Sequence, residues 1–126
     1  MRRDDGAKPP SAGRQVEQRA VEWLAGQGLS IIATNYRSRF GEIDIVADDG
    51  RCVIFVEVRY RRASLYGGAA QSVTRAKQRR ISACAADFLR RHAALSRRPC
   101  RFDVLAASDH SAAPHFEWIK SAFENV

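Results

Sequence analysis

Residues 41–60 read GEIDIVADDGRCVIFVEVRY, two apolar runs separated by an Asp-Asp-Gly turn signal. Asp-Gly between alternating apolar runs predicts a β-hairpin, because both central positions of the tight turn need positive φ. We therefore predict adjacent antiparallel strands over 41–48 and 51–60, with Asp49-Gly50 as a two-residue turn. Both runs also carry acidic side chains among Ile, Val and Phe, where a charge is costly unless it is paired or binds a metal.

The predicted register gathers carboxylates on one face of this hairpin. Side chains alternate along a strand, so Asp44, Phe55, Glu57 and Arg59 project to the same side, with Asp44 opposite Phe55. Asp44 and Glu57 are then diagonal neighbours, about 7 to 8 Å apart at the backbone and within reach of one cation. Glu42, across from Glu57, points the same way. The other face carries the apolar side chains of a core: Ile43, Ile45, Ile54, Val56 and Val58.

Two carboxylates beside a cationic side chain are typical of metal-assisted phosphodiester hydrolysis. Hard oxygen ligands suit Mg²⁺ or Mn²⁺, which bridge a phosphate and lower the pKa of a bound water. Arg59 would stabilise the charge that develops on the phosphate oxygens. The structural alternative is that Glu57 and Arg59 form a same-face ion pair, or that Asp44 caps a neighbouring loop. The spacing by itself leaves both readings open.

Four motifs follow one another along the chain: GEID at 41–44, FVEV at 55–58 with Arg61 after it, Lys77, and RFDV at 101–104. From about Gly13 to the C-terminus, the sequence resembles the YraN family of small bacterial proteins, which is related to archaeal Holliday junction resolvases. The resemblance implies a restriction-endonuclease-like fold. The active site of that fold has the form Asp, then Glu-x-Lys, with a further Glu on the first helix.

The resemblance implies roles for particular residues. Asp44 and Glu57 match the metal ligands and Glu17 matches the helix Glu, so these three would hold Mg²⁺ or Mn²⁺ and Arg59 would complete the catalytic set. Two positions depart from the family: Arg59 replaces the usual lysine, and Val16 replaces the Gly that usually precedes the helix Glu. Arginine stays charged and presents a planar fork, so Arg59 would stabilise a transition state but would not act as a general base.

The remaining periodicity predicts the order α-β-β-β-α-β-β. Helices are expected over 13–27 and 70–94, and further strands over 29–36, 100–107 and 116–122, the last as a short strand or edge segment. This order predicts an α/β fold, a single restriction-endonuclease-like domain over 13–126 with a mixed central β-sheet flanked by helices. Residues 1–12 are predicted to form a disordered basic arm.

Glu17 borders the apolar stripe of the first predicted helix, where it can lean over the sheet toward the carboxylates. The alternative is a surface residue that pairs with Arg14 or Arg19. Asp103, another charge among apolar neighbours, is expected to pair with Arg101 or a helix arginine.

The charge of the chain favours an anionic partner. Its 21 basic and 14 acidic residues give a net charge of +7, and the helix expected over 70–94 has one acid, Asp87, among many bases. The expected partner is nucleic acid, DNA above all. The predicted contacts combine cations with an aromatic side chain in the loop after the hairpin and on the long helix: Arg61, Arg62, Tyr66, Arg75, Lys77 and Arg80. The resemblance also places Lys77 at the edge of the site.

Length and composition exclude several classes. At 126 residues and 45% hydrophobic content the chain can bury one core. It has no apolar run of about 20 residues and no secretory signal, so we expect a cytoplasmic protein without membrane association. Three cysteines without metal-ligand spacing predict reduced thiols, mostly small core residues.

Three functions remain open. The first is a metal-dependent endonuclease acting on DNA, including branched DNA, for which a homodimer would supply the two sites that cleavage of two strands requires. The second is a non-catalytic nucleic-acid binding module whose nuclease site has degenerated at Arg59. The third is a scaffold that binds an acidic protein through its basic face.

Overall fold

The fold comes from a computed structural model, which describes residues 12–62, 73–110 and 113–124. Its elements follow the predicted order of one helix, three strands, one helix and two strands. They are α1 (Ala12–Gly26), β1 (Ser30–Ser38), β2 (Gly41–Asp48), β3 (Val53–Arg62), α2 (Arg75–Arg91), the 3-10 turn η2 (Ala93–Leu95), β4 (Cys100–His110) and β5 (Ala113–Phe123).

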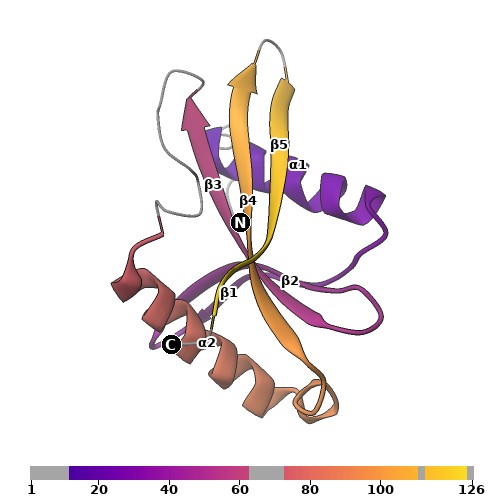
Figure 1. The fold of residues 1–126 in the computed structure, drawn as a ribbon, viewed down its shortest axis with the longest axis vertical. Coiled ribbons are helices and arrows are strands. Elements are labelled where there is room, and N and C mark those ends of the chain that lie inside the picture. The colour runs from indigo at the N-terminus through magenta and orange to yellow at the C-terminus, as the bar shows by residue number, and fades with distance from the viewer. Residues whose placement is uncertain (1–11, 63–72, 111–112, 125–126) are drawn as a thin grey trace, which may run out of the picture.

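The five strands form one sheet in the order β1-β2-β3-β4-β5. Neighbouring strands are antiparallel except β3 and β4, which run parallel with α2 between them in the chain. Parallel neighbours need a crossover connection, and α2 belongs to that connection. The predicted α/β fold with a mixed central sheet is therefore confirmed, and Figure 1 shows this twisted sheet with α1 and α2 packed against it.

Each helix covers its own apolar cluster on the sheet. Ala20 and Leu24 of α1 pack with Leu105 and with alternate residues of the hairpin, Ile45, Ala47, Ile54 and Val56. Phe88 of α2, fully buried, packs with Phe55 in the second cluster, together with Val46, Val53, Phe102 and Val104. The two clusters place α1 and α2 on opposite faces of β3, whose side chains alternate between them.

The helix boundaries differ from the predicted ones at particular residues. α1 begins at Ala12, one residue inside the arm predicted over 1–12; the rest of that arm lies outside the described residues. α2 begins at Arg75, not residue 70, because the Thr74 side chain caps the helix by accepting a hydrogen bond from Lys77 N at 3.1 Å. α2 ends at Arg91, and η2 follows as a separate turn.

The turn between β2 and β3 is longer than predicted. Asp48 pairs with Val53 across the strands, so residues 49–52 form the loop. Its aspartates lengthen it: Asp48 Oδ1 accepts from Gly50 N at 2.7 Å, and Asp49 Oδ1 accepts from Arg51 N and Cys52 N at 2.8 and 2.6 Å. Gly50 has the positive φ expected of the turn, 93°.

The longer loop shifts the register by two residues from the predicted one. Ile45 pairs with Val56, so the next residue, Asp44, comes level with Glu57 rather than Phe55. A shift of two preserves the face of every side chain, whereas a shift of one would have reversed it. The predicted positions of Asp44 opposite Phe55 and of Glu42 opposite Glu57 are therefore wrong, and the two carboxylates lie closer together than a diagonal pair.

The alternation predicted for β2 also fails at one residue. Ile43 was expected on the same face as Ile45, but Ile43 packs in the cluster under α2 together with Val46, while Ile45 packs under α1. The alternation of β2 is therefore interrupted between Ile43 and Ile45. This local change lies at Asp44.

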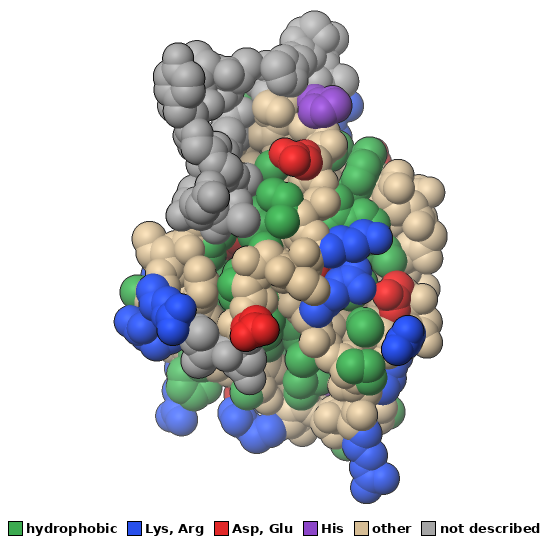
Figure 2. All heavy atoms as spheres, in the orientation of Figure 1, with side chains coloured by type: hydrophobic (Ala, Val, Ile, Leu, Met, Phe, Trp, Pro, Cys, Tyr) green, Lys and Arg blue, Asp and Glu red, His purple; other side chains and the backbone are tan. Residues whose placement is uncertain are grey.

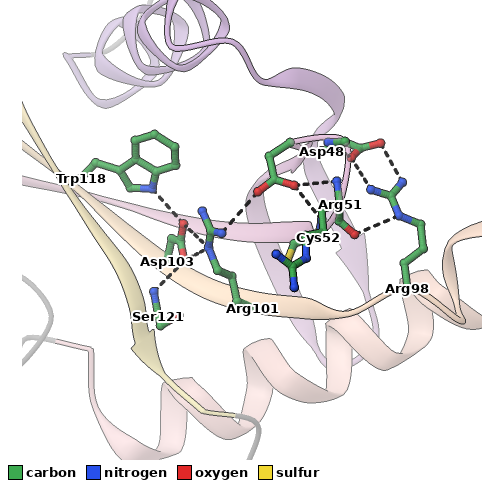
Figure 3. Close-up of polar contacts among 10 residues, drawn as sticks. Asp48, Arg51, Cys52, Arg98, Arg101, Asp103, Trp118 and Ser121 are labelled. Atoms are coloured by element: carbon green, nitrogen blue, oxygen red, sulfur yellow. Dashed lines mark hydrogen bonds and ion pairs between the residues drawn. The ribbon is translucent and has the colours of Figure 1, made fainter.

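Asp103 has the structural role that was expected of it. It is fully buried, and its two oxygens accept from Arg101 Nε at 3.0 and 3.1 Å. Trp118 Nε1 and Ser121 N, both of β5, donate to the same carboxylate at 2.8 and 2.9 Å, as Figure 3 shows. The carboxylate thereby joins β4 to a bulge of β5.

All three cysteines are free thiols, as predicted, but only one lies in the core. Cys84 is buried, whereas Cys52 is partly buried and Cys100 is exposed, so the expectation that most are core residues is wrong. Across the described residues, no helix has the length and apolar character to cross a membrane.

Candidate active site

The candidate site forms where the backbone ladder between β2 and β3 gives way to side-chain contacts. The ladder runs from Asp48 and Val53 to Ile45 and Val56. At the next position Asp44 uses its side chain instead: Oδ2 accepts from Val58 N at 2.8 Å, and the carboxyl group is hydrogen-bonded to Glu57. Two carboxyl groups in contact inside a protein require a proton or a cation between them.

Burial of Asp44 has a large electrostatic effect. Burial, and after it the nearby charge of Glu57, raise the pKa of this carboxyl group from 3.8 to about 8. Glu17 acts in the same direction, while the hydrogen bond from Val58 N opposes it. At neutral pH the Asp44 carboxyl group therefore carries a proton in most of the metal-free molecules.

Two cations contact Glu57, whose side chain is only 4% exposed. Lys77 Nζ, from the first turns of α2, lies 2.7 Å from Glu57 Oε2. Arg59 Nη1, two residues further along β3, lies 3.6 Å from the same oxygen. The predicted same-face ion pair between Glu57 and Arg59 is present, but the shorter contact comes from Lys77.

Glu17 of α1 is connected to Glu42 of β2 by the side-chain amide of Asn35. The Asn35 side chain, oriented so that its nitrogen faces both acids, donates to Glu17 Oε1 at 3.1 Å and to Glu42 Oε2 at 3.0 Å. Asn35 has a positive φ of 52°, a conformation that Asn adopts more readily than most residues. Glu17 thus leans over the sheet, as expected, and Asn35 fixes its direction.

These side chains border a cavity of about 880 Å³ between α1 and the strands β1 and β2. Four of its lining residues are acidic, Glu17, Glu22, Glu42 and Asp44, and one is basic, Arg37. Arg37 forms an ion pair with Glu42 at 3.6 Å. The α1 side of the site is therefore acidic, whereas α2 supplies cations from the other side.

The donor set suits a hard cation but is not a closed cage. Within the described ranges, no three His, Cys, Asp or Glu side chains gather closely enough to hold a metal ion. Asp44 and Glu57 provide two carboxylates in contact, and Glu17 interacts with Asp44 from α1. Mg²⁺ is usually bound by one or two carboxylates and keeps several waters, so this set fits it.

The residues predicted to bind nucleic acid divide into three groups. Arg75 and Arg80 are exposed on α2, and Lys77 contacts Glu57 instead of pointing only to solvent. Arg61 and Arg62 end β3 but their side chains lie outside the described part, as does Tyr66 entirely. Figure 2 shows Lys and Arg side chains over the lower part of one face, the end where α2 lies in Figure 1.

Sequence reasoning missed one member of the site, Asn35, and one contact, that of Lys77 with Glu57. The link between Glu17 and Glu42 depends on Asn35, whose only sequence signal is an Asn within a run of strand formers. The direct contact of Lys77 with Glu57 joins residues 20 positions apart on different elements. Helical spacing places Lys77 on the buried side of α2, four residues before Ile81, but it does not indicate which strand residue Lys77 meets.

The fold and the site define a small single-domain α/β protein of nuclease-like architecture, with a carboxylate pair beside its central strand. The chain belongs to the uncharacterised protein family UPF0102, whose model matches residues 16–107. It is 49% identical over 110 residues to the UPF0102 protein YraN of Escherichia coli, covering 86% of this chain and 81% of that protein. The resemblance to the YraN family is therefore confirmed.

Two further relatives cover most of both chains. A UPF0102 protein of Alcanivorax borkumensis is 47% identical over 114 residues, 90% of this chain and 91% of that protein. A UPF0102 protein of Pseudomonas putida is 44% identical over 119 residues, 94% of this chain and 97% of that protein. The similarity thus extends over the two helices and the sheet.

Proposed function

We propose that this protein is a Mg²⁺- or Mn²⁺-dependent endonuclease that hydrolyses DNA phosphodiester bonds at the Asp44–Glu57 pair. The observation that supports it is the contact between these two carboxyl groups beside two cationic side chains, where burial first and Glu57 second raise the pKa of Asp44 to about 8. A carboxyl group perturbed by burial and by a specific charge partner is a functional-site candidate, because such an arrangement costs stability. A divalent cation bound by the two carboxylates would offset this cost in stability.

Each residue of the site has a separate task in this proposal. Asp44 and Glu57 would hold the cation, with Glu17 directed by Asn35 toward the same place. When bound, Mg²⁺ or Mn²⁺ supplies charge for the phosphate oxygens and a water of lowered pKa. Arg59 and Lys77 both lie beside Glu57, and positive charge from this side of the site would stabilise the phosphate.

The basic surface supports a polynucleotide substrate. Arg75, Arg79, Arg80, Arg90 and Arg91 of α2 form what we term the α2 basic face, which includes the exposed residues predicted to bind nucleic acid. Its single acid, Asp87, is already paired with Arg90, Arg91 and the Tyr36 hydroxyl. The net charge of +7 favours DNA over a neutral or cationic partner. The likeness to junction resolvases favours branched DNA among the substrates to test.

The test is cleavage of labelled linear, flapped and four-way DNA by the purified protein in Mg²⁺ or Mn²⁺. Asp44→Asn and Glu57→Gln keep the side-chain volumes, and each should lower the cleavage rate by at least about 100-fold, the scale of losing a transition-state contact. Glu117→Gln, an exposed acid on β5, is the matched control and should keep the rate. Cleavage that survives in Asp44→Asn and Glu57→Gln would refute the site.

A second candidate is a nucleic-acid binding module without catalysis. It is favoured by Arg59 at the position of the usual lysine, and by the contact of Lys77 with Glu57, which already neutralises one carboxylate. This version predicts salt-sensitive DNA binding without cleavage in either metal. Binding that persists in EDTA, with all three DNAs intact in Mn²⁺, would favour it over the nuclease.

A further inference from the structure

The cation nearest the candidate metal ligand comes from a helix and not from the strand motif. Lys77 Nζ is 2.7 Å from Glu57 Oε2, a hydrogen-bonding distance, whereas Arg59 Nη1 is at 3.6 Å, beyond it. Both side chains are about one-third exposed, so each can also reach a substrate. We infer that Lys77, rather than Arg59, is the catalytic cation of the site and contacts the scissile phosphate. This inference rests on the proposed nuclease function.

The local structure fixes the first turn of α2 on both sides of Lys77. Thr74 accepts the hydrogen bond from Lys77 N at 3.1 Å, which sets the backbone of this residue. Gln78 Nε2 donates to Val73 O at 3.0 Å, and Val73 is buried in the core under α2. The Lys77 ammonium therefore extends from an ordered helical turn, which is held by the Thr74 cap and by the hydrogen bond of Gln78 to the buried Val73.

The chemistry of the two side chains also favours Lys77. An ammonium has three donors in a compact charge, so it can keep one hydrogen bond to Glu57 and offer the others to a phosphate oxygen. The first turn of α2 carries no acidic residue, and a helix N-terminus adds partial positive charge at the same place. A phosphate approaching from the α2 side would meet this charge, while the acidic cavity bounds the site on the α1 side.

The role assigned to Lys77 is charge stabilisation in hydrolysis. A water oxygen bonds to phosphorus as the bond from phosphorus to the leaving oxygen breaks. The attacking water gives up a proton to solvent, and the leaving oxygen takes up a proton from solvent. Between these events the non-bridging oxygens carry extra negative charge. Lys77 would donate to one of them, which is the kind of contact whose loss lowers kcat more than binding.

The experiment compares Lys77→Met, Lys77→Arg and Arg59→Met in steady-state cleavage with Mn²⁺. Arg97→Met, an exposed residue outside the α2 basic face, controls for the loss of one positive charge. We expect Lys77→Met to lower kcat by about 100- to 1,000-fold with KM changed by less than about threefold. Lys77→Arg should recover at least about tenfold of that loss, and Arg59→Met should lose less than about tenfold. Equal kcat values in Lys77→Met and Arg97→Met, or a larger loss in Arg59→Met, would overturn the inference.

A second measurement separates this inference from the proposed function. Mn²⁺ affinity is measured by calorimetry without DNA, since removing an ammonium beside Glu57 should tighten cation binding. We expect at least about threefold tighter Mn²⁺ binding in Lys77→Met and a smaller change in Arg59→Met. Should the native protein bind Mn²⁺ yet cleave none of the DNAs, the nuclease proposal fails, and this comparison decides whether Lys77 is the cation of the site. Equal Mn²⁺ affinities in the native protein and Lys77→Met, or no Mn²⁺ binding in any variant, would count against the role inferred for Lys77.

Discussion

Asp44 is a residue whose charge depends on folding. Its pKa is about 8 in the folded protein and near the usual 3.8 once the chain is unfolded, because burial and Glu57 oppose ionisation only in the fold. Between these two values the folded protein binds a proton that the unfolded chain releases. The contribution to stability is therefore fully present below about pH 4 and is lost as the pH rises through about 8.

We expect the stability difference between the native protein and Asp44→Asn to depend on pH. Asparagine can still accept the hydrogen bond from Val58 N but does not titrate. The free energy of unfolding of the native protein, relative to the variant, should fall by up to about 1.4 kcal/mol per pH unit between pH 5 and 8. Urea unfolding in EDTA at several pH values measures it. Parallel curves for the two proteins would mean that folding does not raise the pKa of Asp44.

The same residues show what alternation can and cannot predict. Asp44 and Glu57 were identified as neighbours because strand periodicity survives a register shift of two. The size of the shift depended on Asp48 and Asp49, whose carboxylates accept backbone hydrogen bonds that a two-residue turn does not need. Side-chain acceptors of this kind act over two or three residues, and a turn signal read from Asp-Gly alone omits them.

At the scale of single elements, α2 connects the core to the candidate site. Its buried side, including Ile81, Cys84 and Phe88, was readable from helical spacing in the sequence. Its start was not, because the pattern continues before Thr74 while the cap is set by one hydroxyl. The position of Lys77 over Glu57 follows from the packing of α2, since Lys77 lies one helical turn before the buried Ile81 and so on the side that faces the sheet.

Removal of the cap should therefore destabilise the protein measurably. Thr74→Ala deletes the acceptor for Lys77 N and should lower the free energy of unfolding by about 1 kcal/mol. Thr74→Ser keeps a hydroxyl at the same position and should lose much less. Denaturant unfolding of both variants at one pH provides the comparison, and equal losses in the two would show that the hydroxyl does not cap α2.

At the scale of the whole molecule, charge is divided between two sides. The cavity under α1 has four acids and one base among its lining residues, whereas the α2 basic face carries five arginines on the helix that packs against the opposite face of β3. Net charge of +7 could be read from the sequence, but its separation into these two regions required the fold. The homodimer expected for two-strand cleavage stays a prediction, which light scattering of the purified protein can test.

The division predicts a defined salt dependence for DNA binding. If the α2 basic face contacts phosphates, the combined variant Arg75→Ala, Arg80→Ala should reduce the slope of log affinity against log salt by about 2, roughly 1 for each lost contact. Arg19→Ala, Arg97→Ala removes the same charge from α1 and from the segment before β4, and its slope should stay near that of the native protein. Fluorescence anisotropy between about 50 and 200 mM NaCl measures both. Equal slopes in the two combined variants would mean that the α2 basic face does not contact DNA phosphates.

The parallel pairing of β3 with β4 also has a consequence for synthesis of the chain. Val53 pairs with Cys100, so this contact closes a separation of 47 residues, whereas β1, β2 and β3 pair with near neighbours. Local pairs form before distant ones because they close shorter loops. As the chain leaves the ribosome, its three N-terminal strands can therefore meet early, but β3 gains its second neighbour only after β4 has emerged. Glu57 lies on that strand, so we expect a nascent chain to complete the site only after β4 has been synthesised.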